Sequence, residues 1–162
     1  FARNISNRIL YMDEGIIYEE GTPEMIFDHP QREKTRAFIQ RIRSLHLHIS
    51  SKDFDLYAMN AEMEAFCEKH MIPPKVEEYV IQVAEEALIL CPEYADTDVI
   101  LSYSEKDGSV ELVRQSKGSP VDPLAEGAQQ DQIGLNIIRS RCKSVGYSYE
   151  NGRNILTLVI KG

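Results

Sequence analysis

The chain lacks the sequence features of several common protein classes. Its longest apolar run, around Ala87 to Cys91, is too short for a membrane-spanning helix, which needs roughly 20 apolar residues. No G-x-x-x-x-G-K-[ST] sequence is present, which excludes a P-loop phosphate site within these residues. No G-x-S-x-G sequence is present either, so nothing favours a Ser-His-Asp hydrolase.

Basic residues and cysteines are also few. Lysine and arginine number 18 against 26 acidic residues, a net charge of −8, whereas a general nucleic-acid or anionic-membrane binder needs a basic surplus. The three cysteines, Cys67, Cys91 and Cys142, show no C-x-x-C spacing. An odd number without metal-binding spacing favours reduced core thiols in a cytoplasmic protein.

What is present suits a globular protein. Hydrophobic residues make up 43% of the 162 residues, enough for one domain or for a small domain with an appendage. The chain begins with Phe1 rather than methionine, so we expect it to be a fragment of a longer polypeptide.

Residues 1–45 predict a β-hairpin followed by two helices. The expected elements are, in order, strand Arg8–Met12, turn Asp13–Gly15, strand Ile16–Gly21, a short helix from Pro23 and a helix Glu33–Leu45. Thr22 is a good N-cap for the first helix, and Pro23 suits its first position. The block has too little apolar surface to fold by itself.

The same block contains a set of family motif residues, which are Phe1-Ala2-Arg3, Arg8, Met12-Asp13-Glu14-Gly15, Glu19-Glu20-Gly21, Thr22-Pro23-Glu24, Phe27, Pro30 and Thr35-Arg36-Ala37-Phe38. With these residues it resembles the C-terminal end of the ATP-binding subunits of ABC transporters, and the polar amino-acid uptake group matches best. In that family the segment lies downstream of the phosphate-binding loop, the signature motif and the metal-binding strand. The resemblance therefore implies a structural tail that cannot hydrolyse ATP alone.

Residues 46–162 predict a second domain that follows without a linker. The expected elements are, in order, a strand over 46–52, helices over 53–70 and from Pro74 to before Pro92, strands Thr97–Ser104 and Ser109–Ser116, a loop Lys117–Ile133, a helix Gly134–Ser144, and strands Tyr147–Glu150 and Ile155–Ile160. This order predicts an α+β fold with helices on one face of a mixed, mostly antiparallel sheet.

Two histidines stand at alternate positions near the start of this domain. His46 and His48 fall on the same face of the first predicted strand. Together they would supply half of a metal site, but no third or fourth ligand lies at a useful spacing in the sequence. We therefore assign no metal site.

Three stretches of the second domain carry family motifs, and they are Gln82–Leu90, Lys117–Leu124 and Ile133–Leu158. Together they resemble the GHKL superfamily of histidine-kinase-like ATPases, with the anti-sigma-factor serine kinases as the nearest branch. The resemblance implies a GHKL-type (Bergerat-like) sandwich of helices on the sheet. It also implies an ATP-like pocket at Glu86, Ser116, Gly118 and Gly134, with Glu86 as the catalytic candidate. The structural alternatives are a solvated helix charge for Glu86, a tight turn for Gly118 and a helix start for Gly134.

Two positions depart from the family pattern. Leu90 stands where the family has the asparagine that holds Mg²⁺, and a leucine offers no ligand oxygen. Ser116 stands where the family has the aspartate that accepts the adenine amino group, and a hydroxyl accepts a weaker hydrogen bond than a carboxylate. Backbone N–H groups at the helix start near Gly134 would still suit an anion. ATP without a complete Mg²⁺ site is therefore the one cofactor candidate.

Two functions follow from these resemblances. The first is the C-terminal fragment of a polar amino-acid importer's ATP-binding subunit, carrying a degenerate GHKL-like domain with a regulatory or protein-interaction role. The alternative is an active ATP-binding serine kinase of the anti-sigma type, and a purely structural or dimerisation domain is a third interpretation. We expect a homodimer, an ABC permease and a regulatory protein as partners, and no nucleic acid. The expected location is cytoplasmic, peripheral on the inner face of the membrane in the parent transporter.

Overall fold

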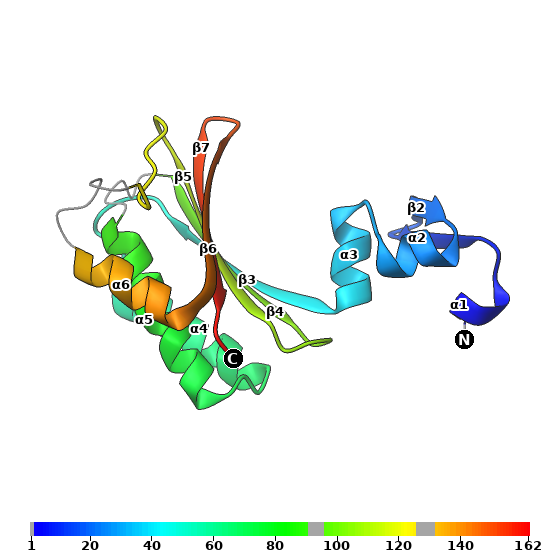
Figure 1. Cartoon of the computed structure of the whole chain (residues 1–162), viewed down its shortest axis with the longest axis horizontal. Helices are drawn as coiled ribbons and strands as arrows, with labels where there is room; N and C mark the ends of the chain where they lie inside the picture. The colour runs from blue at the N-terminus through cyan, green and yellow to red at the C-terminus, as the bar shows by residue number, and fades with distance from the viewer. Residues whose placement is uncertain (1, 91–95, 126–131) are drawn as a thin grey trace. The chain divides into compact units, whose positions relative to one another are not determined.

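The protein divides into two compact units. A computed structural model describes residues 2–90, 96–125 and 132–162 (Figure 1). The first unit comprises Phe1–Arg43 and Ser104–Asp107, and the second comprises Ser44–Tyr103 and Gly108–Gly162.

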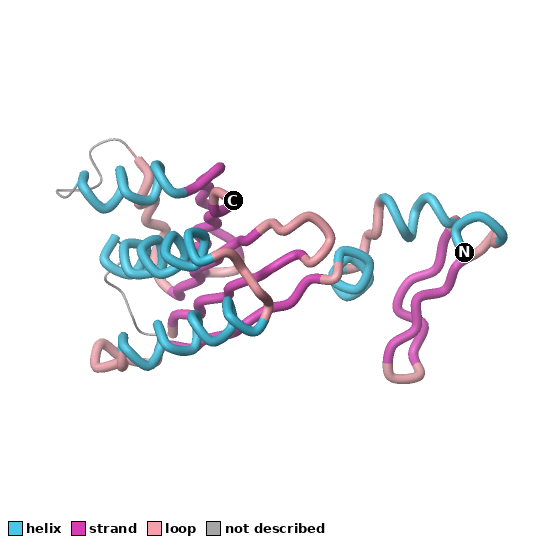
Figure 2. Tube along the Cα trace, turned by 90° about the horizontal axis from the view of Figure 1, so that it is seen from below, coloured by secondary structure: helices cyan, strands magenta, loops and turns pink. Residues whose placement is uncertain are grey.

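The first unit is built from an antiparallel hairpin and short helices (Figure 2). Its elements are α1 (Ala2–Ile5), β1 (Ile9–Asp13), β2 (Ile16–Gly21), α2 (Pro23–Asp28) and α3 (Glu33–Gln40). The hairpin turns at Glu14 and Gly15, and Gly15 has a φ of 78° that glycine adopts without strain. The Thr22 side chain accepts a hydrogen bond from the Met25 N–H at 3.3 Å, which confirms the predicted cap of α2.

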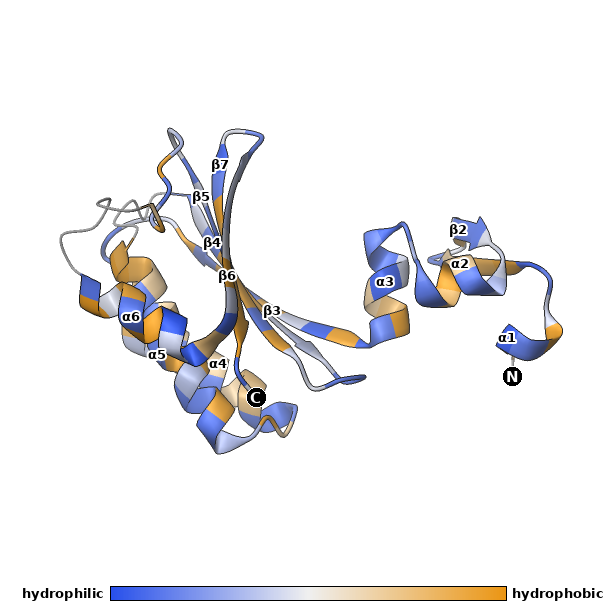
Figure 3. Ribbon diagram, in the orientation of Figure 1, coloured by the Kyte–Doolittle hydropathy of each residue, from blue (hydrophilic) through white to orange (hydrophobic). Residues whose placement is uncertain are grey.

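The helix predicted to run from Glu33 to Leu45 ends at Gln40, so that prediction was wrong. Arg41 adopts the left-handed conformation (φ 52°, ψ 48°), and its N–H bonds the carbonyls of Ala37 and Phe38, which closes the helix. The chain then becomes strand β3 (Ile42–Ile49), along which hydrophobic and hydrophilic residues alternate (Figure 3). A period of two residues belongs to a strand, and it begins earlier than we predicted.

The second unit is a five-stranded sheet with helices on one face, in the order β3-β4-β5-β7-β6 (Figure 1). Its further elements are α4 (Leu56–Lys69), α5 (Pro74–Leu90), β4 (Thr97–Ser104), β5 (Val110–Lys117), α6 (Gln132–Arg141), β6 (Cys142–Glu150) and β7 (Arg153–Ile160). The pairs β4–β5, β5–β7 and β6–β7 are antiparallel. The predicted α+β class with a mostly antiparallel sheet is confirmed.

The core of this unit lies between the sheet and the helices. α5 buries residues at helical spacing, and Val80 and Val83 among them are fully buried. The strands bury every second residue, so that Leu101, Leu112 and Leu158 are also fully buried. Burying each such side chain stabilises the fold by about 1.5–3 kcal/mol before entropy is counted.

The junction between α6 and β6 differs from the prediction. We expected a helix over Gly134–Ser144, but α6 ends at Arg141 and Cys142 already pairs with Ile160 of β7. A register shift between Cys142 and Ser144 absorbs the change from helix to strand. Neither glycine nor proline stands at this junction, so the sequence carries no signal for the helix end.

Candidate functional site

Ion pairs that include residues of the ABC resemblance connect the elements of the first unit. Three ion pairs each include at least one of these residues, and these pairs join Arg3 to Asp28, Arg8 to Glu20, and Lys34 to Asp13. The pairs are exposed, so they contribute little to stability and mainly fix the arrangement of the hairpin and helices. This part of the resemblance is therefore structural rather than chemical.

Glu19 of the same motif set links the hairpin to α3. Its carboxylate accepts hydrogen bonds from the backbone N–H groups of Gln31 (2.7 Å) and Arg32 (3.0 Å), just before the helix begins. Burial raises the pKa of Glu19, but the nearby Thr35 hydroxyl and the backbone hydrogen bonds from Gln31 and Arg32 outweigh it and hold the pKa below its usual value. A carboxylate at a helix N-terminus is also favoured by the helix dipole.

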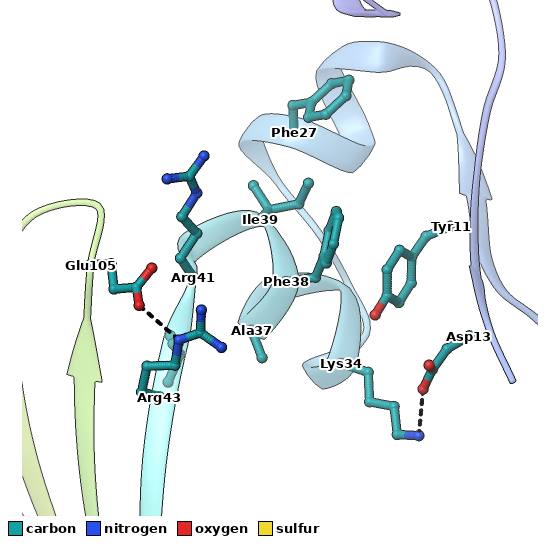
Figure 4. Close-up of a pocket in the computed structure, with 11 residues that line it drawn as sticks. Tyr11, Asp13, Phe27, Lys34, Ala37, Phe38, Ile39, Arg41, Arg43 and Glu105 are labelled. Carbon is teal, nitrogen blue, oxygen red and sulfur yellow. Dashed lines mark hydrogen bonds and ion pairs between the residues drawn. The ribbon is translucent and has the colours of Figure 1, made fainter. Parts of the chain in front are cut away.

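An open cavity of about 790 Å³ lies within the first unit (Figure 4). The rings of Tyr11 and Phe38 lie 5.1 Å apart on its wall, and Phe38 remains 64% exposed. The charged groups on the wall are largely paired, since Lys34 bonds Asp13 at 2.8 Å and Arg43 bonds Glu105 at 2.7 Å. An aromatic wall with paired charges suits contact with an apolar protein surface.

Polar side chains form a row across the buried face of the second unit's sheet. Thr97, Ser116 and Asn154 lie side by side on β4, β5 and β7, and all three are buried. Arg114, two residues before Ser116 on the same face of β5, is only 1% exposed. Buried polar groups require hydrogen bonds, so this end of the sheet is held by a polar network.

Asn154 fixes the turn that follows β5. Its Nδ2 donates to the Ser119 carbonyl at 2.9 Å, and its Oδ1 accepts from the Val121 N–H at 2.9 Å and from the Tyr147 hydroxyl at 2.7 Å. The N–H of Gly118 also donates to the Gly152 carbonyl at 3.2 Å. The turn after β5 is therefore bound to the β6–β7 hairpin.

Ser116 is engaged by the buried arginine. Arg114 Nη1 donates to Ser116 Oγ at 3.0 Å. The serine oxygen therefore faces a cation, and this hydrogen bond occupies part of the oxygen's acceptor capacity. Lys117, the next residue on the strand, is exposed.

Glu86 and Gly134 lie in direct contact. Glu86 is on α5, and its carboxylate lies so close to Gly134 in the first turn of α6 that any Cβ at that position would clash with Glu86 Oε2. α6 carries no acidic residue of its own in its first turn. The carboxylate of Glu86 therefore supplies negative charge where the helix dipole favours an anion. Leu90 is buried beside the same glycine.

The structure thus arranges the predicted site residues in two groups. Glu86 meets Gly134, whereas Ser116 is the cross-strand neighbour of Asn154 and Gly118 is bonded to Gly152 in the β6–β7 turn. Sequence reasoning missed Arg114 and Asn154. The alternation along Val110, Leu112 and Arg114 was the signal that placed an arginine on the inner face.

Part of the chain is homologous to ATP-binding subunits of amino-acid ABC transporters. It is 45% identical over 47 residues to the L-cystine import ATP-binding protein TcyN of Bacillus subtilis, covering 29% of this chain and 18% of that protein. It is 45% identical over 42 residues to the general L-amino acid transport ATP-binding protein AapP of Rhizobium johnstonii, covering 26% of this chain and 16% of that protein. The glutamine transport ATP-binding protein GlnQ of Geobacillus stearothermophilus is also 45% identical over 42 residues, covering 26% of this chain and 17% of that protein.

The chain therefore spans less than a fifth of the length of these relatives. No family profile matches the chain. Within the described ranges, no helix combines the length and apolar character needed to cross a bilayer.

Proposed function

We propose that this chain is the C-terminal part of the ATP-binding subunit of a polar amino-acid importer. Residues 1–45 are the tail of its ATPase domain. Residues 46–162 are a GHKL-like domain that has lost catalysis and acts in regulation or protein interaction. The observation that carries the proposal is the local identity to amino-acid import ATP-binding proteins, of 45% over 47 residues in one case.

The surface of the first unit supports its assignment as a tail. Among its described residues, Ile26 is the one buried hydrophobic side chain. Large hydrophobic side chains on the hairpin and on α3 are at least 43% exposed, and they are Leu10, Met12, Ile16, Ile17 and Phe38. A surface of this kind is covered by a partner in a stable protein. The remainder of the ATPase domain is the partner we propose.

The arrangement of the second unit supports a GHKL-like fold. Helices α4, α5 and α6 lie on one face of the sheet (Figure 1). The Glu150–Asn154 motif of the resemblance forms the β6–β7 turn and supplies the asparagine that binds the turn at Gly118–Val121. The motifs therefore act together as structural parts of one architecture.

The side chains at the pocket positions support a loss of catalysis. Leu90 is buried among apolar residues and offers no ligand to Mg²⁺. Ser116, at the position of the family's adenine-binding carboxylate, already has the Arg114 cation as its hydrogen-bond partner.

The partners and the location are part of the same proposal. The parent polypeptide binds an ABC permease at the cytoplasmic face of the membrane, and the second unit forms a homodimer or binds a regulatory protein. These assignments come from the relatives' transport role and from the resemblance to anti-sigma-factor kinases.

Transport by the parent protein tests the proposal. The full ATP-binding subunit is reconstituted with its permease, and ATP-driven uptake is measured with and without residues 46–162. We expect uptake to persist and its response to accumulated substrate to change, because the deleted domain regulates rather than hydrolyses. Unchanged uptake with an unchanged response would contradict the regulatory role, and uptake lacking in both forms would contradict the importer assignment.

A further inference from the structure

Three metal-ligating side chains converge on the sheet of the second unit, away from Glu86 and Gly134. They are His48 on β3, Asp98 on β4 and Asp96, which lies just before β4. One ligand atom from each lies within 4.8 Å of the other two, and no other such group of histidine, cysteine and acidic residues occurs in the described part of the chain. The sequence could not reveal it, because His48 and Asp98 become neighbours only when β3 pairs with β4.

The arrangement around these carboxylates is already ordered. His48 Nδ1 lies 2.8 Å from Asp98 Oδ1, and Arg153 Nη1 donates to the other oxygen, Oδ2, at 2.9 Å. Arg153 Nη2 also donates to Asp96, at 3.3 Å from Oδ1. Hydrogen bonds of this kind orient carboxylates that bind metal ions. Arg153 thus turns Asp98 so that Oδ1 faces the imidazole.

We infer that His48, Asp96 and Asp98 bind a divalent transition-metal ion, with Zn²⁺ as the best fit. One imidazole nitrogen and two carboxylate oxygens suit Zn²⁺, while Mg²⁺ and Ca²⁺ prefer oxygen ligands alone. The metal binds Nδ1 of the neutral His48 imidazole, whose one ring proton then sits on Nε2, and water fills the open coordination positions.

The side chains have the freedom and the access that binding needs. His48, Asp96 and Asp98 are 55%, 44% and 34% exposed, so an ion enters from solvent. Two ligand atoms around tetrahedral Zn²⁺ lie roughly 3.4 Å apart, so the His48–Asp98 contact opens by a few tenths of an ångström. The two positive charges of the ion also offset the carboxylates more fully than Arg153 alone.

Such a site ties the edge strand of the sheet to its neighbour. Among the strands that the structure describes, β3 pairs only with β4, and edge strands are the least constrained part of a sheet. A metal bridging β3 and the start of β4 adds a link that the backbone ladder does not provide. The site is therefore a structural brace, separate from any nucleotide pocket.

The cysteines described by the structure do not compete for the ion. Cys67 and Cys142 are buried, and burial raises their pKa to about 12 and about 11. A thiol must lose its proton to bind zinc. A Cys91→Ser background removes the third thiol from the experiment.

Zinc titration of the whole chain by isothermal calorimetry tests the site, using Cys91→Ser as the reference protein. We expect one Zn²⁺ per chain with a micromolar Kd, and at least a tenfold weakening in His48→Ala and Asp98→Asn. His46→Ala is the matched control, because His46 lies on the same face of β3 outside the cluster, and it retains the reference affinity. Equal affinity of His48→Ala and His46→Ala, or no saturable binding at millimolar Zn²⁺, would overturn the inference.

The change in melting temperature on adding Zn²⁺ is a second measurement. It compares each variant with itself, so a variant that is less stable from the start does not give a false result. Zn²⁺ raises the melting temperature of the reference protein and of His46→Ala, and EDTA reverses the shift. His48→Ala shows a zinc-independent melting temperature, whatever its own value. A zinc-induced shift of the same size in His48→Ala would also overturn the inference.

Discussion

Replacement of Asn154 by alanine tests whether the polar network holds the second unit together. Asn154 is 8% exposed and makes three hydrogen bonds, to the Ser119 carbonyl, the Val121 N–H and the Tyr147 hydroxyl. Each bond contributes about 1 kcal/mol net, and the three partner groups lose their partner together. We therefore expect Asn154→Ala to lower the free energy of unfolding by about 3 kcal/mol.

The assay is urea unfolding followed by far-UV circular dichroism, because the chain contains no tryptophan. Asn136→Ala is the matched control, since Asn136 is exposed on α6, and we expect a change of no more than about 0.5 kcal/mol. Asn154→Asp separates the donor from the acceptor. It keeps the acceptor for Val121 and Tyr147 but sets an oxygen against the Ser119 carbonyl, so it also destabilises. If Asn154→Ala lowers the free energy of unfolding by less than about 1 kcal/mol, the three hydrogen bonds of Asn154 do not hold the second unit together.

Three further predictions concern other contacts. In a Glu86→Ala background, Gly134→Ala stabilises the protein by about 1 kcal/mol because alanine has the higher helix propensity. In the wild type the stabilisation is smaller, because the new Cβ displaces the Glu86 carboxylate. Additive effects in a double-mutant cycle of urea unfolding would contradict the contact. Iodoacetamide at pH 8 labels neither Cys67 nor Cys142 in the native protein, because burial raises their pKa to about 12 and about 11. Both cysteines are labelled in urea, and mass spectrometry measures the labelling. Glu19→Gln lowers stability at neutral pH. The loss of stability is smaller in acid. A carboxyl whose pKa is lowered in the folded state stabilises the fold above its unfolded-state pKa, and this stabilisation disappears as the pH falls. Equal losses at pH 7 and pH 3 would argue against this.

Local sequence signals predicted the parts of the fold that depend on neighbouring residues. The turn at Gly15, the cap at Thr22 and the strand Thr97–Ser104 are confirmed. Each depends on backbone freedom, on a short side chain beside a helix start or on strict alternation. The end of α3 was not predictable, because Arg41 adopts a left-handed conformation for which arginine carries no preference.

Contacts between distant strands and helices were the harder part. The close contact at Gly134 comes from Glu86 on another helix. His48 and Asp98 lie close together because their strands pair, although about 50 residues separate them in the sequence. Family resemblance named Glu86, Ser116, Gly118 and Gly134, but whether they bind ATP stays a prediction. Residue type and spacing cannot show that Ser116 is hydrogen-bonded to a buried arginine.

ATP binding by the whole chain tests whether the second unit has lost its nucleotide site. Isothermal titration is carried out with ATP in the presence and absence of Mg²⁺. Leu90 offers no metal ligand, and Ser116 accepts a hydrogen bond from Arg114. We therefore expect no saturable, magnesium-dependent binding at millimolar ATP. Micromolar binding that requires Mg²⁺ would contradict this expectation, and would favour the active serine kinase instead.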